Sequence, residues 1–192
     1  MLVGEYAEGK EMKKPFTSLR ITGGELKNKE IKSPEDKKTH PMGSRERLAL
    51  MNIIGPDIKN AVILDAFSGT GAIGFEALSR GANHVTFIEK NHQIAAVLKE
   101  NVKNLGIEKT TQVFEKNVED LDFKSEFDYV IADPPYDKIN KIKSETFDKL
   151  VRLSKKAFIL SHPSNFDPHS VNAELKSTKS YAGARISIFT KS

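Results

Sequence analysis

The chain of 192 residues contains no cysteine. This absence excludes disulfide bonds, thiolate nucleophiles and cysteine-ligated zinc sites. The sequence also lacks any apolar run near the ~20 residues that a membrane-spanning helix requires, so we expect no membrane partner. Histidines are few and show no metal-ligand spacing, so we expect no metal site. They are His40, His84, His92, His162 and His169.

Length and composition indicate one α/β domain with short appendages. A chain of this size can bury one substantial core but not two. Hydrophobic residues make up 38% and charged residues 29% of the chain, as is usual for globular proteins. Residues 1–17 show no periodicity and no apolar core of a secretory signal. We therefore expect a flexible tail there and a cytoplasmic, monomeric protein, in which Met12 is as natural a start as Met1.

Positive charge is concentrated near the N-terminus. From Lys13 to Arg47 there are ten Lys or Arg residues against five Asp or Glu residues, whereas the rest of the chain is nearly neutral. A basic segment beside a neutral domain favours a polyanionic partner, although a solvated lysine-rich face would have the same composition.

Short apolar segments separated by turn residues predict alternating strands and helices. Gly23-Gly24 separates two stretches that can form a hairpin, and a helical pattern runs from Ser44 to the Gly55-Pro56 break. The alternation beyond residue 60 predicts an α/β fold with a mostly parallel, seven-stranded sheet that ends in an antiparallel hairpin joined at Ala182-Gly183. Its expected strands are 61–67, 85–89, 112–114, 127–132, 157–160, 174–181 and 185–190, and its expected helices are 71–79, 94–105 and 145–153.

A glycine-rich turn follows the first strand of this sheet. Gly69, Gly71 and Gly74 form the pattern G-x-G-x-x-G between a strand and a helix, where the backbone can approach a ligand closely. Glu89 ends the next strand twenty positions after Gly69, where a carboxylate can accept hydrogen bonds from ribose hydroxyls. Both NAD and S-adenosylmethionine meet these requirements. Asp65 favours the second, because a carboxylate binds an ammonium group but repels a pyrophosphate.

The tetrapeptide Asp133-Pro134-Pro135-Tyr136 follows the expected strand 127–132, at the edge of the sheet where ligands bind. The Asp133 carboxylate and the Pro134 carbonyl can each accept a hydrogen from an exocyclic amine and so orient its nitrogen toward an electrophilic methyl group. Tyr136 offers a face for stacking an extruded base. A strand-end cap and an ordinary surface aromatic are the alternatives. Together with the glycine turn, the tetrapeptide favours a methyl donor.

These segments resemble the bacterial RsmD-type 16S rRNA guanine-N2 methyltransferases. The resemblance runs from Leu19 to Phe189 and rests on LRITGG, the R-x-R-x-A-L-M-N helix start, LDAFSGTGAIGFEALSRGA, FIEKN, ADPPY and KSYAGARISIF. It implies a Rossmann-like class I S-adenosylmethionine-dependent methyltransferase fold for residues 59–192 and an RNA-contacting hairpin and helix for residues 18–58. It also implies direct methyl transfer to the exocyclic N2 of a specific guanine, in 16S rRNA or in a 30S particle.

Three groups of site residues are expected: the resemblance implies the first two, and the basic N-terminal segment supplies the third. The guanine would be held by Asp133, Pro134 and Tyr136. The cofactor S-adenosylmethionine would be bound by Asp65, Phe67, Gly69, Gly71, Glu89, Lys90, Asn117, Val118 and Asp133. The RNA would contact Arg20, Lys27, Lys29, Arg45 and Arg47. Within the cofactor group, Glu89 would take the ribose hydroxyls and Asn117 the adenine edge.

The chain departs from the family pattern at two places. His40-Pro41-Met42 stands where the family has Arg-Pro-Thr, and Leu48 stands where an acidic residue is usual. Two other functions remain open: methylation of adenine N6 in DNA or RNA, which the same tetrapeptide would serve, and RNA binding in ribosome assembly without catalysis. A nicotinamide-dependent dehydrogenase is a third, but it leaves Pro-Pro-Tyr unexplained.

Overall fold

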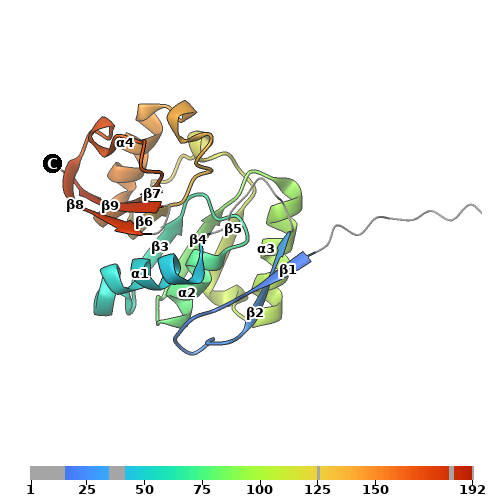
Figure 1. The fold of residues 1–192 in the computed structure, drawn as a ribbon. Coiled ribbons are helices and arrows are strands. Elements are labelled where there is room, and N and C mark those ends of the chain that lie inside the picture. The colour runs from blue at the N-terminus through green and yellow to red at the C-terminus, as the bar shows by residue number, and fades with distance from the viewer. Residues whose placement is uncertain (1–15, 35–41, 125, 182–183, 192) are drawn as a thin grey trace, which may run out of the picture.

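A seven-stranded sheet forms the centre of this computed structural model, which describes residues 16–34, 42–124, 126–181 and 184–191 (Figure 1). Its strands are β3 (Val62–Asp65), β4 (His84–Ile88), β5 (Thr111–Phe114), β6 (Phe127–Ala132), β7 (Ser154–His162), β8 (Glu174–Tyr181) and β9 (Ala184–Thr190). They follow the order β5-β4-β3-β6-β7-β9-β8, in which β9 runs antiparallel to both neighbours and the other pairs are parallel. The predicted sheet is confirmed, although Ala182-Gly183 lies outside the described residues.

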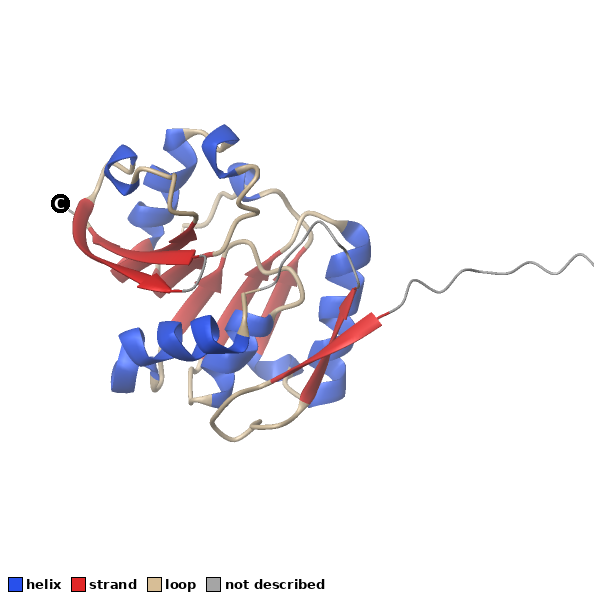
Figure 2. Ribbon diagram, in the orientation of Figure 1, coloured by secondary structure: helices blue, strands red, loops and turns tan. Residues whose placement is uncertain are grey.

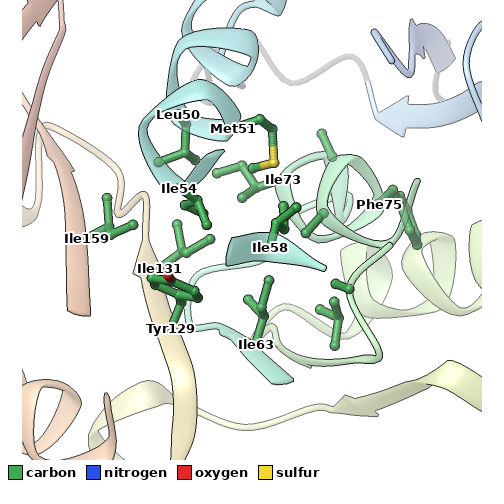
Figure 3. Close-up of a cluster of buried hydrophobic side chains, with 14 of the residues drawn as sticks. Leu50, Met51, Ile54, Ile58, Ile63, Ile73, Phe75, Tyr129, Ile131 and Ile159 are labelled. Carbon is green, nitrogen blue, oxygen red and sulfur yellow. The ribbon is translucent and has the colours of Figure 1, made fainter. Parts of the chain in front are cut away.

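Helices cover both faces of the sheet (Figure 2). One apolar cluster joins one face to α1 (Ser44–Ile54), α2 (Ala72–Ser79) and α3 (His92–Leu105), and another joins the opposite face to α4 (Ser144–Leu153). Figure 3 shows Leu50, Met51 and Ile54 of α1 gathered with Ile63 and Ile131 of the strands. Because the central strands β3, β4 and β6 are buried on both faces, they appear in the sequence as mostly apolar runs, whereas the edge strand β8 is largely exposed and polar.

The N-terminal segment shares this core. The strands β1 (Phe16–Arg20) and β2 (Glu30–Pro34) form a separate antiparallel hairpin, and β2 packs against α3 (Figure 1). Ile21 and Ile31 are buried in the same cluster as α1 and the sheet. The hairpin and helix are therefore an extension of the main domain. Phe16 and Thr17 belong to β1, so the expected tail over residues 1–17 is wrong at its end; residues 1–15 and His40 lie outside the described residues.

Most expected boundaries agree with the structure to within three residues, but β7 is longer than the sequence indicates. It extends over Ser154–His162, whereas the apolar pattern predicts only 157–160. Lys155 and Lys156 hide the start of the strand because they are exposed. Ser161 and His162 hide its end because they are polar, yet both are buried and hydrogen-bonded through their side chains.

The strand order places a topological switch point at the carboxyl ends of β3 and β6, where open α/β sheets form a crevice. The chain passes from β3 through α2 to β4 on one side, whereas β6 pairs with β3 on the other. Ligands in open α/β sheets bind at such a switch point. Asp65 ends β3 and Asp133 follows β6, so the two predicted carboxylates lie at this crevice. Among the described residues, no helix is long and apolar enough to cross a membrane and no metal-ligating cluster is found.

Candidate active site

The glycine turn is held by hydrogen bonds between β3 and β4. Ser68 donates from its backbone N–H to the Ile88 carbonyl, and its Oγ accepts from the Ile88 N–H at 2.8 Å. The same hydroxyl donates to the carbonyl of Asp65 at 2.7 Å. One buried serine therefore fixes both the end of β3 and the path of the turn.

Two glycines in this turn have positive φ angles, for different reasons. Gly71 (φ +85°) precedes α2, and a Cβ there would lie 2.4 Å from Cδ1 of Leu98. Gly69 (φ +53°) has open space where a Cβ would point. Its N–H donates to Oε2 of Glu89 at 3.0 Å. Gly71 thus allows close packing of α2 and α3, whereas Gly69 borders free space at the crevice.

Asp65 is a fully buried carboxylate with one unsatisfied oxygen. Its Oδ2 accepts from the N–H of Gly74 at 3.1 Å, whereas its Oδ1 has no hydrogen-bond partner in the described part of the chain. Burial raises the pKa of Asp65 to about 7, helped by the negative charges of Asp133 and Glu89 and opposed by the Gly74 N–H. A buried unpaired oxygen of this kind is ready to accept a hydrogen bond from a cationic ligand group.

The predicted ribose and adenine residues follow β4 and β5, the two strands beside β3 on one side of the sheet. Glu89 holds the turn through Gly69, and its Oε1 accepts from the N–H of Asn91 at 2.7 Å. Asn117 precedes the short helix η3 (Val118–Asp120) and donates to Oε2 of Glu119 at 3.4 Å. Val118 is buried, Phe67 is half-buried and Lys90 is exposed. Their roles toward a cofactor stay predictions.

The tetrapeptide lies where β6 leaves the sheet. Asp133 is partly exposed, and Pro134 is buried behind it. Burial of the carboxyl group raises the pKa of Asp133 to about 6, and a hydrogen bond with the Ser161 side chain opposes this. Tyr136 is 36% exposed, while its hydroxyl oxygen lies 2.7 Å from Oγ of Ser161. A carboxylate and an aromatic face are thus presented together at the crevice.

The predicted RNA contacts divide into accessible and inaccessible side chains. Lys27, Lys29 and Arg45 are exposed, and Arg20 is exposed while paired with Glu30 at 3.0 Å. Arg47 is buried inside the protein, so its expected role in RNA contact is wrong. Only 2% of its surface is exposed, and the alternation of charged residues along the helix start does not reveal this burial.

The Arg47 guanidinium is used inside the protein. It donates to Oε1 of Glu76 at 3.3 Å and to the carbonyls of Met42 and Arg20 at 2.8 Å and 2.9 Å. Glu76 of α2 is itself fully buried, and it also accepts from Thr22 and Arg80. This network joins the hairpin, α1 and the helix that follows the glycine turn.

Replacing Arg47 with methionine is expected to lower the free energy of unfolding by about 3 kcal/mol, because it leaves a buried carboxylate short of a cation. Arg45→Met, on the exposed side of the same helical turn, is the control and should change stability by less than about 0.5 kcal/mol. Urea unfolding of both variants measures the difference. Equal stabilities would show that the network contributes little.

Sequence patterns missed two polar residues of this region. Glu76 lies in an apolar helix, and nothing in its neighbours marks it as the centre of a charge network. Ser161 follows the apolar run of β7 at the edge where Asp133 follows β6. A polar residue at the carboxyl end of a central strand would mark such a site. The apolar pattern ends at Leu160, however, so the sequence places Ser161 outside the strand.

Residues 19–190 match the protein family described as "Conserved hypothetical protein 95". The chain belongs to this family. Among its relatives, "Putative rRNA methyltransferase YlbH" of Bacillus subtilis is 29% identical over 74% of this chain and 81% of its own length. "Ribosomal RNA small subunit methyltransferase D" of Haemophilus influenzae is 35% identical over 62% of this chain and 64% of its own length, just under two thirds. The predicted resemblance to the RsmD type is confirmed.

Solved structures confirm the fold of this family member. The "Putative methyltransferase yhhF from Escherichia coli" superposes with a TM-score of 0.76 at 25% identity, over 92% of this chain and all (100%) of that one. A Thermus thermophilus 16S rRNA N2 methyltransferase, solved with AdoMet and guanosine, superposes with a TM-score of 0.72 at 18% identity, over 93% of this chain and 50% of that one. The fold is that of the class I S-adenosylmethionine-dependent methyltransferases.

Proposed function

We propose that the protein transfers a methyl group from S-adenosylmethionine to the exocyclic N2 of a guanine in 16S ribosomal RNA, and so acts in the cytoplasm. The observation that carries this proposal is the pair of carboxylates, Asp65 and Asp133, at the ends of neighbouring strands of the crevice. One is suited to a cationic cofactor and the other to an amine. The names of the relatives, which include small-subunit rRNA methyltransferases, support the ribosomal substrate.

The crevice offers a group for each part of the cofactor. The unpaired Oδ1 of Asp65 is suited to the α-ammonium group, and the open space at Gly69 admits the methionine chain beside the turn. Glu89 lies next to the turn, where its carboxylate can accept from the ribose hydroxyls. Asn117 and the Val118 backbone then border the adenine. Phe67 and Lys90 would border the same cofactor.

Methyl transfer at this site needs no covalent enzyme intermediate. S-adenosylmethionine, when bound, would supply an electrophilic methyl group to the N2 lone pair and would leave as the neutral thioether. Asp133 and the Pro134 carbonyl accept hydrogen bonds from the amine and so aim its lone pair at the methyl group. The N2 proton becomes acidic only after the new bond has begun to form, so Asp133 would act chiefly as the acceptor that orients the amine and would then take up this proton. Tyr136 supplies the stacking face for the extruded guanine.

RNA would approach along the basic N-terminal extension. A groove of about 430 Å³ lies between β1 and the start of α1, and its polar lining includes Ser18, Arg20 and Ser44. Lys27 and Lys29 lie in the turn between the two hairpin strands, and Arg45 lies on the first turn of α1. Phosphate contacts from these side chains would hold the RNA while its guanine enters the crevice.

Replacing Lys27 and Lys29 together with alanine is expected to weaken RNA binding and to lower the slope of log K against log salt by about 2, because each phosphate contact contributes about one unit. The control replaces Lys109 and Lys155, two exposed lysines outside this extension, and should leave the slope unchanged. Binding isotherms at several salt concentrations give both slopes. If both double variants lose RNA affinity and salt dependence equally, the RNA does not bind specifically at Lys27 and Lys29.

The decisive test is transfer of labelled methyl from S-adenosylmethionine to 16S rRNA and to 30S particles that lack native modification, followed by nucleoside analysis. Label in N2-methylguanosine supports the proposal and identifies the preferred substrate. Label in N6-methyladenosine would keep the mechanism but change the target base. RNA binding without any transfer would indicate an assembly factor.

A further inference from the structure

Ser161 is a buried hydroxyl next to the tetrapeptide. It lies near the end of β7, which pairs with β6 on one side and with β9 on the other. Only 2% of its surface is exposed. A buried hydroxyl is costly unless it is hydrogen-bonded, so the partners of Ser161 explain why it is tolerated there.

Both partners belong to the candidate active site. The Ser161 Oγ lies 2.7 Å from the hydroxyl oxygen of Tyr136. Because Leu160 pairs with Ala132, Ser161 also lies beside Asp133, and a hydrogen bond from its side chain to the Asp133 carboxyl group acts against burial to lower the pKa of Asp133. Ser161 therefore connects the first and last residues of Asp133-Pro134-Pro135-Tyr136, although it lies 25 residues further along the chain.

Hydrogen-bond chemistry gives the two bonds a direction. An ionised carboxylate only accepts, so Ser161 donates to Asp133. A serine hydroxyl has one hydrogen, so its oxygen must accept from Tyr136. Burial raises the pKa of the Tyr136 phenol, which keeps the proton needed for this bond. The chain of donation therefore runs from Tyr136 through Ser161 to Asp133.

We propose that Ser161 is a positioning residue for methyl transfer, which holds the Asp133 carboxylate and the Tyr136 ring in one fixed arrangement around the amine. This inference rests on the proposed function. The bond from Ser161 orients the carboxylate from within the sheet, and the remaining acceptor capacity of Asp133 faces the substrate amine. The bond from Tyr136 limits rotation of the ring on which the base would stack.

Among the described residues, the pKa values of Asp65 and Tyr136 respond to the charge of Asp133. Asp65 at the end of β3 is close enough for the two carboxyl groups to interact, and Asp133 raises the pKa of Asp65. The charge of Asp133 and that of Glu46 on α1 both raise the pKa of Tyr136. The pKa of Asp133 itself reflects its burial and the Ser161 bond, so removal of that bond should change the titration of Asp133 directly.

The test compares Ser161→Ala with Ser161→Thr and with Ser187→Ala in the full chain. Ser187 on β9 is another fully buried hydroxyl at this edge of the sheet, but it bonds His162 and Thr178. We expect Ser161→Ala to lower kcat roughly 10- to 100-fold through misplacement of the amine. Its acidic limb of kcat should move to higher pH, while the affinity for S-adenosylmethionine changes little. Ser161→Thr should restore the rate, and Ser187→Ala should behave as the wild type.

A second measurement does not depend on activity. Carbon-detected NMR titration of the Asp133 carboxyl group should show a higher pKa in Ser161→Ala than in the wild type, Ser161→Thr or Ser187→Ala. If Ser161→Ala and Ser187→Ala lose rate equally, or if the Asp133 titration is the same in all four proteins, Ser161 has only a structural role and the proposal is overturned. If the wild type transfers no methyl group, the proposed function fails, and the NMR titration alone decides whether Ser161 holds Asp133.

Discussion

Asp133→Asn is expected to lower kcat for methyl transfer about 1,000-fold, within the range for loss of a positioned proton acceptor. The asparagine has nearly the same shape, but its amide can present donors to the substrate amine where the carboxylate presents only acceptors. Affinity for S-adenosylmethionine should remain within about threefold, because Asp65 and the glycine turn hold the amino acid end of the cofactor. Steady-state kinetics and calorimetric titration of the cofactor measure the two quantities.

The matched control for this variant is Asp137→Asn, an exposed carboxylate immediately after the tetrapeptide. It should retain the wild-type rate. Because the pKa of Asp133 is raised to about 6, the wild-type kcat should also fall about tenfold for each pH unit below 6, as the acceptor becomes protonated. Comparable losses of kcat and cofactor affinity in Asp133→Asn would contradict its assignment to the substrate amine.

Cofactor affinity is expected to depend on pH through Asp65. The carboxyl group must be ionised to pair with the α-ammonium group, and its pKa is about 7 in the free protein. Affinity for S-adenosylmethionine should therefore be constant above this pH and fall about tenfold for each pH unit below it. Asp65→Asn should weaken binding at pH 8 roughly 10- to 100-fold and remove this pH dependence. Calorimetric titrations across this pH range measure both effects.

Ionisation of Asp65 strengthens cofactor binding but should lower the stability of the cofactor-free protein. The folded state holds the Asp65 proton up to a pH of about 7, whereas the unfolded chain releases it near the ordinary pKa of 3.8. The free energy of unfolding should therefore decrease as the pH rises between these values. Asp65→Asn should remove this loss and stabilise the cofactor-free protein at pH 8 by on the order of 2–4 kcal/mol.

The control for Asp65→Asn is Asp128→Asn, which changes a carboxylate at the other end of the sheet. The Asp128 carboxylate accepts a hydrogen bond from the N–H of Val62 at 2.8 Å. It therefore lies at the start of β3, whereas Asp65 lies at the end of the same strand. This variant should leave the pH dependence of cofactor affinity unchanged. If Asp65→Asn bound the cofactor as tightly as the wild type at pH 8, another group would have to hold the ammonium.

Local sequence patterns predicted those parts of the site that lie in short continuous segments. The glycine turn, Glu89 and the tetrapeptide each follow an apolar strand, and parallel strands bring their carboxyl ends to one edge. The same reasoning failed for Arg47. A cation at the start of a basic helix has the same local pattern whether it faces RNA or a buried Glu76, since the partner lies 29 residues away in the chain.

The sequence by itself determined the alternation of strands and helices, the mostly parallel sheet and the residues that line its carboxyl edge, because periodicity and turn chemistry are local properties. Only the tertiary structure decided which polar groups are buried together. The unpaired oxygen of Asp65, the network around Glu76 and the bonds of Ser161 to Asp133 and Tyr136 all depend on contacts between distant segments. The pKa values of the two carboxyl groups follow from that packing, because desolvation is set by the atoms that surround a group in space.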